Sequence, residues 1–221
     1  MDDVTRGQIE RLHGSGFGRD RRPLLVCDVD EVVLHLVSPF EAVLQERGYE
    51  LRSKSFKLTG NIFHRETGAE ATQADVWAAL TQLFEEQDRR QHPVEGVADG
   101  LAEIARDVEV VFLTNMPHQF GERRRTHLSA HGMDYPLLTN TGTKATGIAE
   151  LKRDRPATGF VDDTPVNLTQ VAEAHPDVRL FHFMADDVFR GLVAPMESVS
   201  ISTGNWREAA PHIRERLLAE A

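Results

Sequence analysis

Short apolar runs recur along the chain, and stretches with helical spacing separate them. A run of mostly apolar residues is typical of a β-strand that is covered on both faces. Five such runs lie at residues 24–28 (LLVCD), 108–113 (VEVVFL), 135–138 (YPLL), 158–163 (TGFVDD) and 178–184 (VRLFHFM). They predict the strands of one buried sheet.

Helices are predicted between these strands. Apolar residues recur at the spacing of one helix face from Val97 to Ala105, and Pro117 suits the first turn of a helix that ends near Gly132. Further helices are expected around 148–151, at 167–174 and at 207–218, with a short helix and a loop over residues 1–22. Strands that alternate with helices predict an α/β fold, a doubly wound parallel sheet with a Rossmann-like core.

One segment interrupts this alternation. Between residue 38 and about residue 91 the apolar spacing is helical at both ends, and residues 51–69 in the middle are less regular. The positions that carry the helical spacing are Phe40, Val43, Leu44, Val76, Leu80, Leu83 and Phe84. We therefore expect an α/β core made of residues 1–35 and 93–221, and an inserted helical module made of residues 36–92.

Composition narrows the class of protein. The chain has 221 residues, of which 40% are hydrophobic, so it can bury a substantial core. Its formal net charge of −10 argues against nucleic acid or an anionic membrane surface as a partner, since both favour basic proteins. A small diffusible substrate or a cationic partner fits better, and the oligomeric state stays open.

Cysteine usage and the amino terminus bear on the compartment. Cys27 is the single cysteine, so no disulfide within the chain is possible and a reducing compartment is compatible. The first residues, MDDVTRGQIE, lack the apolar segment of a secretory signal, and no run approaches the ~18 apolar residues of a membrane span. We expect a cytoplasmic protein.

Polar residues with catalytic potential follow the predicted strands. Asp28 and Asp30 follow the first strand, Thr114 the second, Lys144 lies beyond YPLL, and Asp162 and Asp163 end the strand 158–163. In an open parallel sheet the carboxyl ends of the strands form one edge, and ligands bind in the crevice there. A carboxylate nucleophile, a proton donor, a hydroxyl and a cation at one edge suit metal-dependent phosphoryl transfer.

The chemistry of such a site can be argued from these residues. Asp28 would attack phosphorus and form an aspartyl-phosphate, and Asp30 would protonate the leaving oxygen and later accept a proton from water. Asp28, Asp162, Asp163 and a phosphate dianion would repel one another strongly without a divalent cation. Mg²⁺ fits best, because it prefers oxygen ligands and commonly combines carboxylates with a substrate phosphate.

These residues also carry a family resemblance. In Asp28-Val29-Asp30-Glu31-Val32-Val33, Thr114-Asn115, Lys144 and residues 159–163 (GFVDD), the chain resembles the haloacid dehalogenase (HAD) superfamily, in its phosphohydrolase branch. The match spans residues 24 to 165 in the family's order. It implies a phosphatase of a small phosphorylated metabolite, with residues 36–92 as a mobile cap that excludes water and recognises the substrate.

The resemblance also implies roles for the matching residues. Asp28 and Asp162 would give Mg²⁺ side-chain oxygens and Asp30 its main-chain carbonyl, while Asp163 would be a further or an indirect ligand. The Thr114 hydroxyl and the Asn115 backbone N–H would donate to phosphoryl oxygens. Lys144 would neutralise the charge that builds up on the nucleophile and phosphate. Lys152 is the rival for that role, disfavoured because it lies late in a predicted surface helix.

The sequence departs from the family's commonest pattern after the second aspartate. Glu31 stands where glycine is frequent and Val32 where threonine is frequent. Glu31 with His35 also resembles the protein-serine phosphatase branch of the superfamily. That branch lacks a helical insertion of this kind, so we rank it low.

Other features are interpreted as structural. The glycines of residues 14–18 follow no strand, so they predict a flexible connection rather than a phosphate loop. Residues 123–125 (RRR) fit a solvated helix face, although one arginine could reach a substrate anion. Cys27 is expected to be a small apolar residue of a buried strand, and the ten histidines show no metal-binding spacing.

Three other functions stay open on the sequence. Dehalogenation would use the Asp28 carboxylate but would need neither Asp30 nor the metal. A phosphotransferase or phosphomutase would keep every residue and differ in the acceptor. A non-catalytic phospholigand-binding protein would bind without turnover. As candidate specificity residues of the cap we name Phe56, Lys57, His64 and Arg65.

Overall fold

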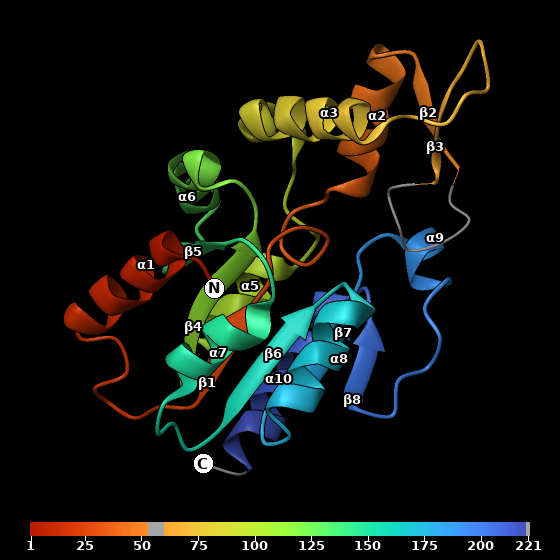
Figure 1. Ribbon diagram of the computed structural model, residues 1–221. Coiled ribbons are helices and arrows are strands. Elements are labelled where there is room, and N and C mark those ends of the chain that lie inside the picture. The colour runs from red at the N-terminus through yellow and green to blue at the C-terminus, as the bar shows by residue number, and fades with distance from the viewer. Residues whose placement is uncertain (53–59, 220–221) are drawn as a thin grey trace.

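A six-stranded parallel sheet forms the centre of the molecule (Figure 1). The computed structural model describes residues 1–52 and 60–219. From one edge to the other the strands are β5 (Leu137–Asn140), β4 (Glu109–Asn115), β1 (Leu24–Cys27), β6 (Thr158–Asp162), β7 (Arg179–Phe183) and β8 (Val199–Thr203). The first strand of the chain thus lies inside the sheet, between β4 and β6.

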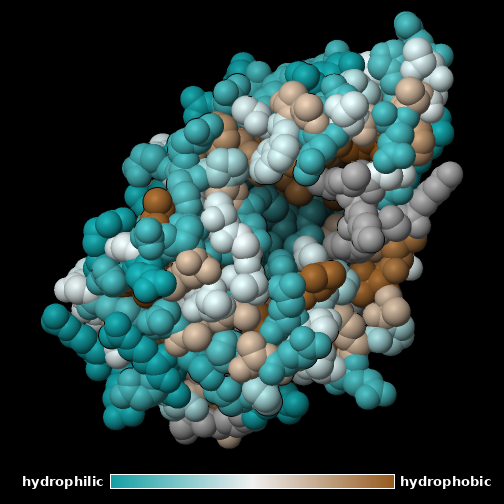
Figure 2. Space-filling view, viewed as in Figure 1, coloured by the Kyte–Doolittle hydropathy of each residue, from teal (hydrophilic) through white to brown (hydrophobic). Residues whose placement is uncertain are grey.

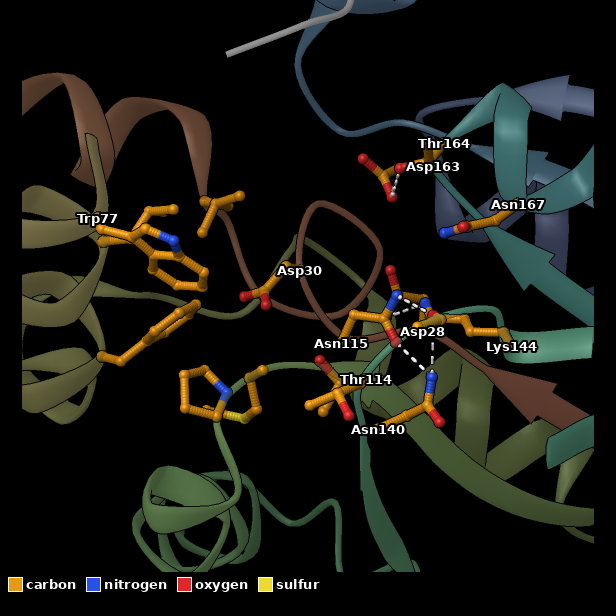
Figure 3. Close-up of a pocket in the computed structure, with 17 residues that line it drawn as sticks. Asp28, Asp30, Trp77, Thr114, Asn115, Asn140, Lys144, Asp163, Thr164 and Asn167 are labelled. Atoms are coloured by element: carbon orange, nitrogen blue, oxygen red, sulfur yellow. Dashed lines mark hydrogen bonds and ion pairs between the residues drawn. The ribbon is translucent and has the colours of Figure 1, made fainter. Parts of the chain in front are cut away.

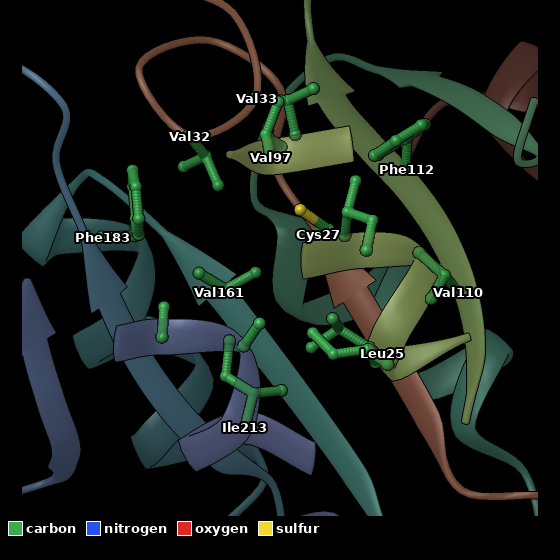
Figure 4. Packing of buried hydrophobic residues seen from close by; sticks show 14 of the residues in the cluster. Leu25, Cys27, Val32, Val33, Val97, Val110, Phe112, Val161, Phe183 and Ile213 are labelled. Carbon is green, nitrogen blue, oxygen red and sulfur yellow. The ribbon is translucent and has the colours of Figure 1, made fainter. Parts of the chain in front are cut away.

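Helices cover both faces of the sheet, and the alternation of side chains along β1 explains why. Leu25 and Cys27 pack into an apolar cluster with α5 (Val97–Ile104) and α10 (Trp206–Leu218), part of which Figure 4 shows. Leu24 and Val26 pack on the other face. That face is covered by α1 (Asp3–Gly14), α7 (Lys144–Lys152) and α8 (Pro165–Ala174). The predicted doubly wound α/β fold is confirmed.

The order of the strands creates the crevice expected of such a sheet. After β1 the chain adds β4 and β5 on one side, and then β6, β7 and β8 on the other. Loops therefore diverge at the carboxyl end of β1, which is where ligands bind in open α/β sheets. This edge of the sheet carries Asp28, Thr114 and Asp162.

The inserted segment contains strands as well as helices. Its elements are α2 (Val37–Glu46), β2 (Tyr49–Leu51), β3 (Ile62–His64), α3 (Gln73–Glu85) and α4 (Gln87–Arg90). The strands β2 and β3 pair antiparallel, with β2 at the start of the irregular stretch and β3 inside it, and we predicted neither strand. Strands of three residues are too short for their alternation to be recognised. Between α2 and α3 the segment has its own apolar cluster, which includes Phe40, Leu44 and Leu83.

Two further differences lie in the core. The sixth strand β8 and the short helix α9 (Asp187–Arg190) occupy a region for which we predicted no element. In β8 the half-buried Val199 and Ile201 alternate with exposed serines, a weak signal that is usual for an edge strand. After Pro117 the chain first forms the 3₁₀ turn η1 (His118–Phe120), and the helix α6 (Gly121–Ala130) follows.

Within the described residues, no helix is both long enough and apolar enough to cross a membrane.

Candidate active site

The carboxyl ends of the central strands open into a pocket of about 610 Å³ beneath the inserted segment. Figure 2 shows the surface hollowed there, with hydrophilic residues at the floor. The described residues that line it are Asp28, Asp30, Leu36, Trp77, Leu80, Phe84, Thr114, Asn115, Met116, Pro117, Asn140, Thr141, Gly142, Lys144, Asp163, Thr164 and Asn167. Most of the predicted site residues therefore share one cavity.

Lys144 bridges two of the predicted carboxylates. It is the first residue of α7, capped by Thr143, and its side chain is 1% exposed. Its Nζ lies 2.7 Å from Asp28 Oδ1 and 2.7 Å from Asp162 Oδ2. Burial opposes the charge, but the two carboxylates outweigh it and raise the pKa of Lys144 above its ordinary value. The residue is therefore a fixed cation beside Asp28.

Asp162 and Asp163 are neighbours in sequence but face different surroundings. Asp162 is fully buried, and its Oδ1 accepts hydrogen bonds from the Thr164 N–H and the Asn167 side chain, both at 2.9 Å. Its Oδ2 accepts from Lys144. Asp163, in contrast, lines the pocket, where its Oδ1 accepts from the Thr164 hydroxyl at 3.1 Å. Figure 3 shows the Asp163 carboxylate directed into the cavity, on the same side as Asp28.

The charges in this part of the site do not balance without a cation. Asp28, Asp162 and Asp163 each offer an oxygen within 4.8 Å of the others, and Lys144 is the cation in contact with two of them. Three carboxylates against one ammonium leave an excess of two negative charges in a buried site. A hard divalent ion with oxygen ligands fits both the donors and the charge, so the residues present suit Mg²⁺.

The pKa values reflect the same imbalance. Burial raises the pKa of Asp28 to about 7, with Lys144 acting against the shift and the Asp162 charge adding to it. Burial and the charges of Asp162 and Asp28 likewise raise the pKa of Asp163 well above its ordinary value. A nearby dication would favour the ionised form of both carboxyls. Asp28 would then be ready to act as a nucleophile at neutral pH.

Thr114 and Asn115 end β4 at the floor of the pocket. The Thr114 hydroxyl is buried, and within the described chain it has no hydrogen-bond partner. A buried polar atom without a partner is costly, and a phosphoryl oxygen in the pocket would satisfy it. The Asn115 Oδ1 accepts from the Asn140 amide at 2.7 Å, and Asn115 donates to the Gly142 carbonyl at 3.1 Å. Asn115 thus braces the loop that leads to Lys144.

Asp30 is held by a buried arginine that links the inserted segment to the core. Arg124 of α6 donates from Nη1 to Asp30 Oδ1 at 2.9 Å and from Nη2 to Gln91 Oε1 at 3.0 Å. It also donates to Gln87 of α4. Gln91 in turn donates to Asp30 Oδ1 at 2.8 Å. Both donors bind Asp30 Oδ1, so Oδ2 takes part in neither bond and remains available for proton transfer in the pocket.

The turn that carries Asp28 and Asp30 is fixed by Glu31 and Trp206. Glu31 has a φ of 59°, which explains why glycine would suit this position. Its buried carboxylate accepts from the N–H groups of Leu36 and Val37 at 2.6 Å and of Asp186 at 3.0 Å. The Trp206 indole donates to the Val32 carbonyl at 2.8 Å. Glu31 is therefore a structural anchor rather than a pocket residue.

Several predicted candidates lie elsewhere. Lys152 ends α7 and pairs with Asp177 at 2.7 Å, away from the carboxylates. His64 ends β3, Arg65 follows it, and neither lines the pocket. Phe56 and Lys57 lie outside the described residues. From the inserted segment, residues of α3 line the pocket instead.

Sequence reasoning missed several residues of the site, among them Arg124, Gln91, Asn140 and Asn167. A signal existed for Asn140, since β4 and β5 both end in Leu-Thr-Asn and the register pairs Asn115 with Asn140. Asn167 lies in the first turn of α8, within reach of the strand end before it. For Arg124 the signal was ambiguous, because three arginines stand in a row and only α6 packing selects the buried one.

Comparison with known proteins places the fold. No protein-family model matches the sequence. No curated protein matches it either. Solved structures do resemble it. A candidate HAD-hydrolase, YfnB of Bacillus subtilis, bound to magnesium, has a TM-score of 0.59 at 12% identity, over 87% of this chain and 98% of that one.

Two more solved structures extend the comparison. A HAD family hydrolase of Deinococcus radiodurans, with bound phosphate and sodium, has a TM-score of 0.56 at 11% identity, over 87% of this chain and 95% of that one. A candidate beta-phosphoglucomutase of Bacteroides vulgatus has a TM-score of 0.54 at 13% identity, over 100% of this chain and 99% of that one. The chain therefore has the fold of the haloacid dehalogenase-like hydrolases, as its resemblance in sequence predicted.

Proposed function

We propose that this protein is a Mg²⁺-dependent phosphohydrolase of the HAD superfamily, which cleaves a small phosphate monoester through an aspartyl-phosphate on Asp28. One observation carries the proposal. Asp28, Lys144 and the carboxylates of residues 162 and 163 lie together at the carboxyl ends of β1 and β6, with an excess of negative charge and the unpartnered Thr114 hydroxyl beside them. This arrangement suits a dication and a phosphoryl group.

The metal ligands follow from which carboxylates face the cavity. Asp28 and Asp163 would hold Mg²⁺ with their side chains and Asp30 with its main-chain carbonyl. We assign Asp163 rather than Asp162 as the direct ligand, because Asp162 is buried behind it and is bonded to Lys144, Thr164 and Asn167. When bound, the ion would neutralise the phosphate and the nucleophile. In this assignment Asp162 orients Lys144.

The first half of the reaction forms a bond from an Asp28 oxygen to phosphorus and breaks the ester P–O bond. Lys144 offsets the negative charge of Asp28 and the phosphoryl oxygens, and the Thr114 hydroxyl donates to one of those oxygens. Asp30 gives its proton to the leaving alcohol. Arg124 and Gln91 hold the Asp30 carboxylate in place through the transfer.

The second half returns the site to its starting state. Asp30, now ionised, accepts a proton from a water molecule, and the oxygen of that water attacks the aspartyl-phosphate. The bond from phosphorus to Asp28 breaks, inorganic phosphate leaves, and Asp30 is protonated again. The inserted segment, residues 36–92, would act as the cap that excludes other water.

Phosphotransfer is the second candidate function. A structural neighbour is named as a candidate beta-phosphoglucomutase, and its fold covers the whole chain. A mutase would use the same nucleophile and differ only in passing the phosphoryl group to an alcohol in place of water. Dehalogenation is disfavoured, because it would need neither Asp30 nor the excess of carboxylates.

The test is hydrolysis of p-nitrophenyl phosphate by purified protein with Mg²⁺ or with EDTA. We expect activity that requires Mg²⁺ and falls by more than about 10³-fold in Asp28→Asn, since the nucleophile is lost. Asp177→Asn is the matched control, because Asp177 pairs with Lys152 at the surface. Activity that survives Asp28→Asn would contradict the proposal.

A further inference from the structure

The pocket has two chemically different halves. Its polar residues surround Asp28 at the strand ends. Its apolar residues are Leu36, Trp77, Leu80, Phe84, Met116 and Pro117. Figure 3 shows them separated: Trp77 lies across the cavity from Asp28 and Lys144, and Asp30 lies between. A site for a phosphate alone would need only the polar half.

The apolar half, which we call the apolar wall, is built mainly by α3. On this helix Val76, Ala79 and Leu83 pack inward against α2. Trp77, Leu80 and Phe84 form a second apolar face at the spacing i, i+3 and i+7, directed at the pocket. Helices at a protein surface normally carry polar residues on the face away from their core. Leu80 packs in part against the inner cluster and Phe84 is buried, so Trp77 is the residue of this face that needs a partner.

No residue of the described chain buries Trp77. It is 51% exposed although it is the largest side chain of the wall. Phe84 is buried against Met116 and Phe120, which fixes α3 over the pocket, while Trp77 remains open toward the cavity. An exposed aromatic side chain in a concave site is characteristic of a ligand contact.

The wall also offers few hydrogen bonds. Of its six residues, Trp77 has the indole N–H as a donor and Met116 a weakly accepting sulfur, and the other side chains are hydrocarbon. A ligand rich in hydroxyl groups would lose bonds to water there without regaining them. An apolar ligand would gain from leaving water.

The position of Asp30 sets the direction of the substrate. If Asp28 attacks phosphorus and Asp30 protonates the leaving oxygen, the carbon skeleton attached to that oxygen must extend past Asp30. Beyond Asp30 lies the apolar wall. The pocket of about 610 Å³ has room for such a skeleton in addition to the phosphate.

We propose that the site takes phosphate monoesters of apolar alcohols, with an aromatic or aliphatic skeleton packed on Trp77 and Leu80, in preference to hydroxyl-rich sugar phosphates. This inference rests on the proposed function and names its substrate class. It also disfavours a sugar phosphomutase, because that reaction needs hydrogen bonds to the hydroxyl groups of the substrate.

The test compares esters that share a primary alcohol leaving group, so that their intrinsic reactivity is matched. The substrates are n-hexyl phosphate, benzyl phosphate, glycerol 1-phosphate and glucose 6-phosphate. We expect kcat/KM for the two apolar esters to exceed that for glucose 6-phosphate by at least about 10-fold, since unpaired hydroxyl groups disfavour the sugar.

Variants of Trp77 test whether this residue causes the preference for apolar esters. Trp77→Ala should lower the ratio of hexyl to glucose phosphate by about 10-fold, because it removes the main apolar contact. Trp77→Phe should retain most of the ratio. The control Val188→Ala removes an apolar residue of α9 that is 61% exposed and lies outside the pocket, and it should leave the ratio unchanged.

The two ways to fail can be told apart. Hydrolysis of glucose 6-phosphate that depends on Asp28 and equals that of the apolar esters would overturn this inference and leave the proposed function intact. If no ester is hydrolysed in a way that depends on Asp28, the proposed function fails. Calorimetric titration of the Asp28→Asn protein then decides the inference: tighter binding of hexyl phosphate than of glucose 6-phosphate supports it, and equal affinity refutes it.

Discussion

Lys144 and Lys152 begin and end the same helix, yet only one of them reaches the carboxylates. Lys144 is buried between Asp28 and Asp162, whereas Lys152 pairs with Asp177 at the surface. In the proposed mechanism Lys144 is the fixed positive charge beside the transferred group. Its removal also leaves buried carboxylates without their partner.

Lys144→Met should therefore lower kcat/KM for p-nitrophenyl phosphate by about 10² to 10³-fold, the range found when one electrostatic contact to a transition state is lost. Lys152→Met serves as the matched control and should stay within about twofold of the unchanged protein. Near-UV circular dichroism would establish that both variants are folded. Equal activity of the two variants would exclude Lys144 from the chemistry.

Arg124 is expected to act through Asp30. If it positions the proton donor, its loss should matter most for esters whose leaving group needs the proton. We expect Arg124→Met to lower kcat/KM for hexyl phosphate by about 10²-fold, and for p-nitrophenyl phosphate, whose leaving group is stable as an anion, much less. Arg124→Lys should restore part of the loss, and Arg125→Met, in the exposed neighbour, should change neither. Equal losses on both substrates would indicate a purely structural role.

At the residue scale, the sequence predicted most of the groups that lie at strand ends and missed several whose place depends on helix packing. The side chains of residues 28, 114 and 162 share an edge because parallel strands end together, which needs no knowledge of packing. Arg124 and Trp77 lie on helices, where the face that turns inward depends on tertiary contacts. The run of three arginines and the apolar pattern of α3 each allow more than one face.

Glu31 shows how an element can depend on one residue. It lies in the turn after β1, and its carboxylate accepts two N–H groups at the start of α2, the first helix of the inserted segment. It also accepts the Asp186 N–H of the loop before α9. Glu31 thus joins the beginning of the insertion to the core.

Glu31→Gly should destabilise the protein by about 3 kcal/mol, because buried N–H groups lose a charged acceptor. The loss should occur even though glycine relieves the positive φ, which contributes about 1 kcal/mol in the opposite direction. Glu31→Gln keeps one acceptor oxygen and should cost less. Urea denaturation measures both variants, and a glycine variant as stable as the unchanged protein would contradict this role.

At the element scale, long periodic segments were predictable and short ones were not. The buried strands β1, β4 and β6 and the helix α10 follow from their apolar patterns. The hairpin β2–β3 and the edge strand β8 do not, since each is short and only partly buried. The assignment of residues 36–92 as a separate cap stays a prediction.

At the scale of the whole molecule, His127 makes stability depend on pH. It is buried beside Arg124 and His131, and its Nε2 contacts the Gln91 carbonyl at 2.8 Å. Burial lowers the pKa of His127 below its ordinary value, the hydrogen bond with the Gln91 carbonyl opposes this shift, and the Arg124 charge adds to it. A lowered pKa means that the unfolded chain binds the proton more readily. The stability that this group contributes is complete above about pH 6.5, and it is lost as the pH falls through the pKa of His127 in the folded protein.

The readout is the change in free energy of unfolding between about pH 7.5 and about pH 5, compared between the unchanged protein and His127→Gln. The buried Asp28 and Asp163 have raised pKa values and contribute with the opposite sign, so only the difference between the two proteins is informative. We expect the free energy of unfolding to decrease less on acidification in the variant than in the unchanged protein. A loss of equal size would show that His127 titrates alike in both states.

The fold class was predictable because strands and helices alternate along the chain around a buried sheet. The chemistry at its centre rests on Asp28 becoming phosphorylated. The direct measurement is a single turnover with ³²P-labelled hexyl phosphate and Mg²⁺, quenched in acid within milliseconds and mapped by peptide sequencing. We predict label on the peptide that contains Asp28, and none in Asp28→Asn. Label on another residue, or turnover of the ester without any labelled protein, would contradict it.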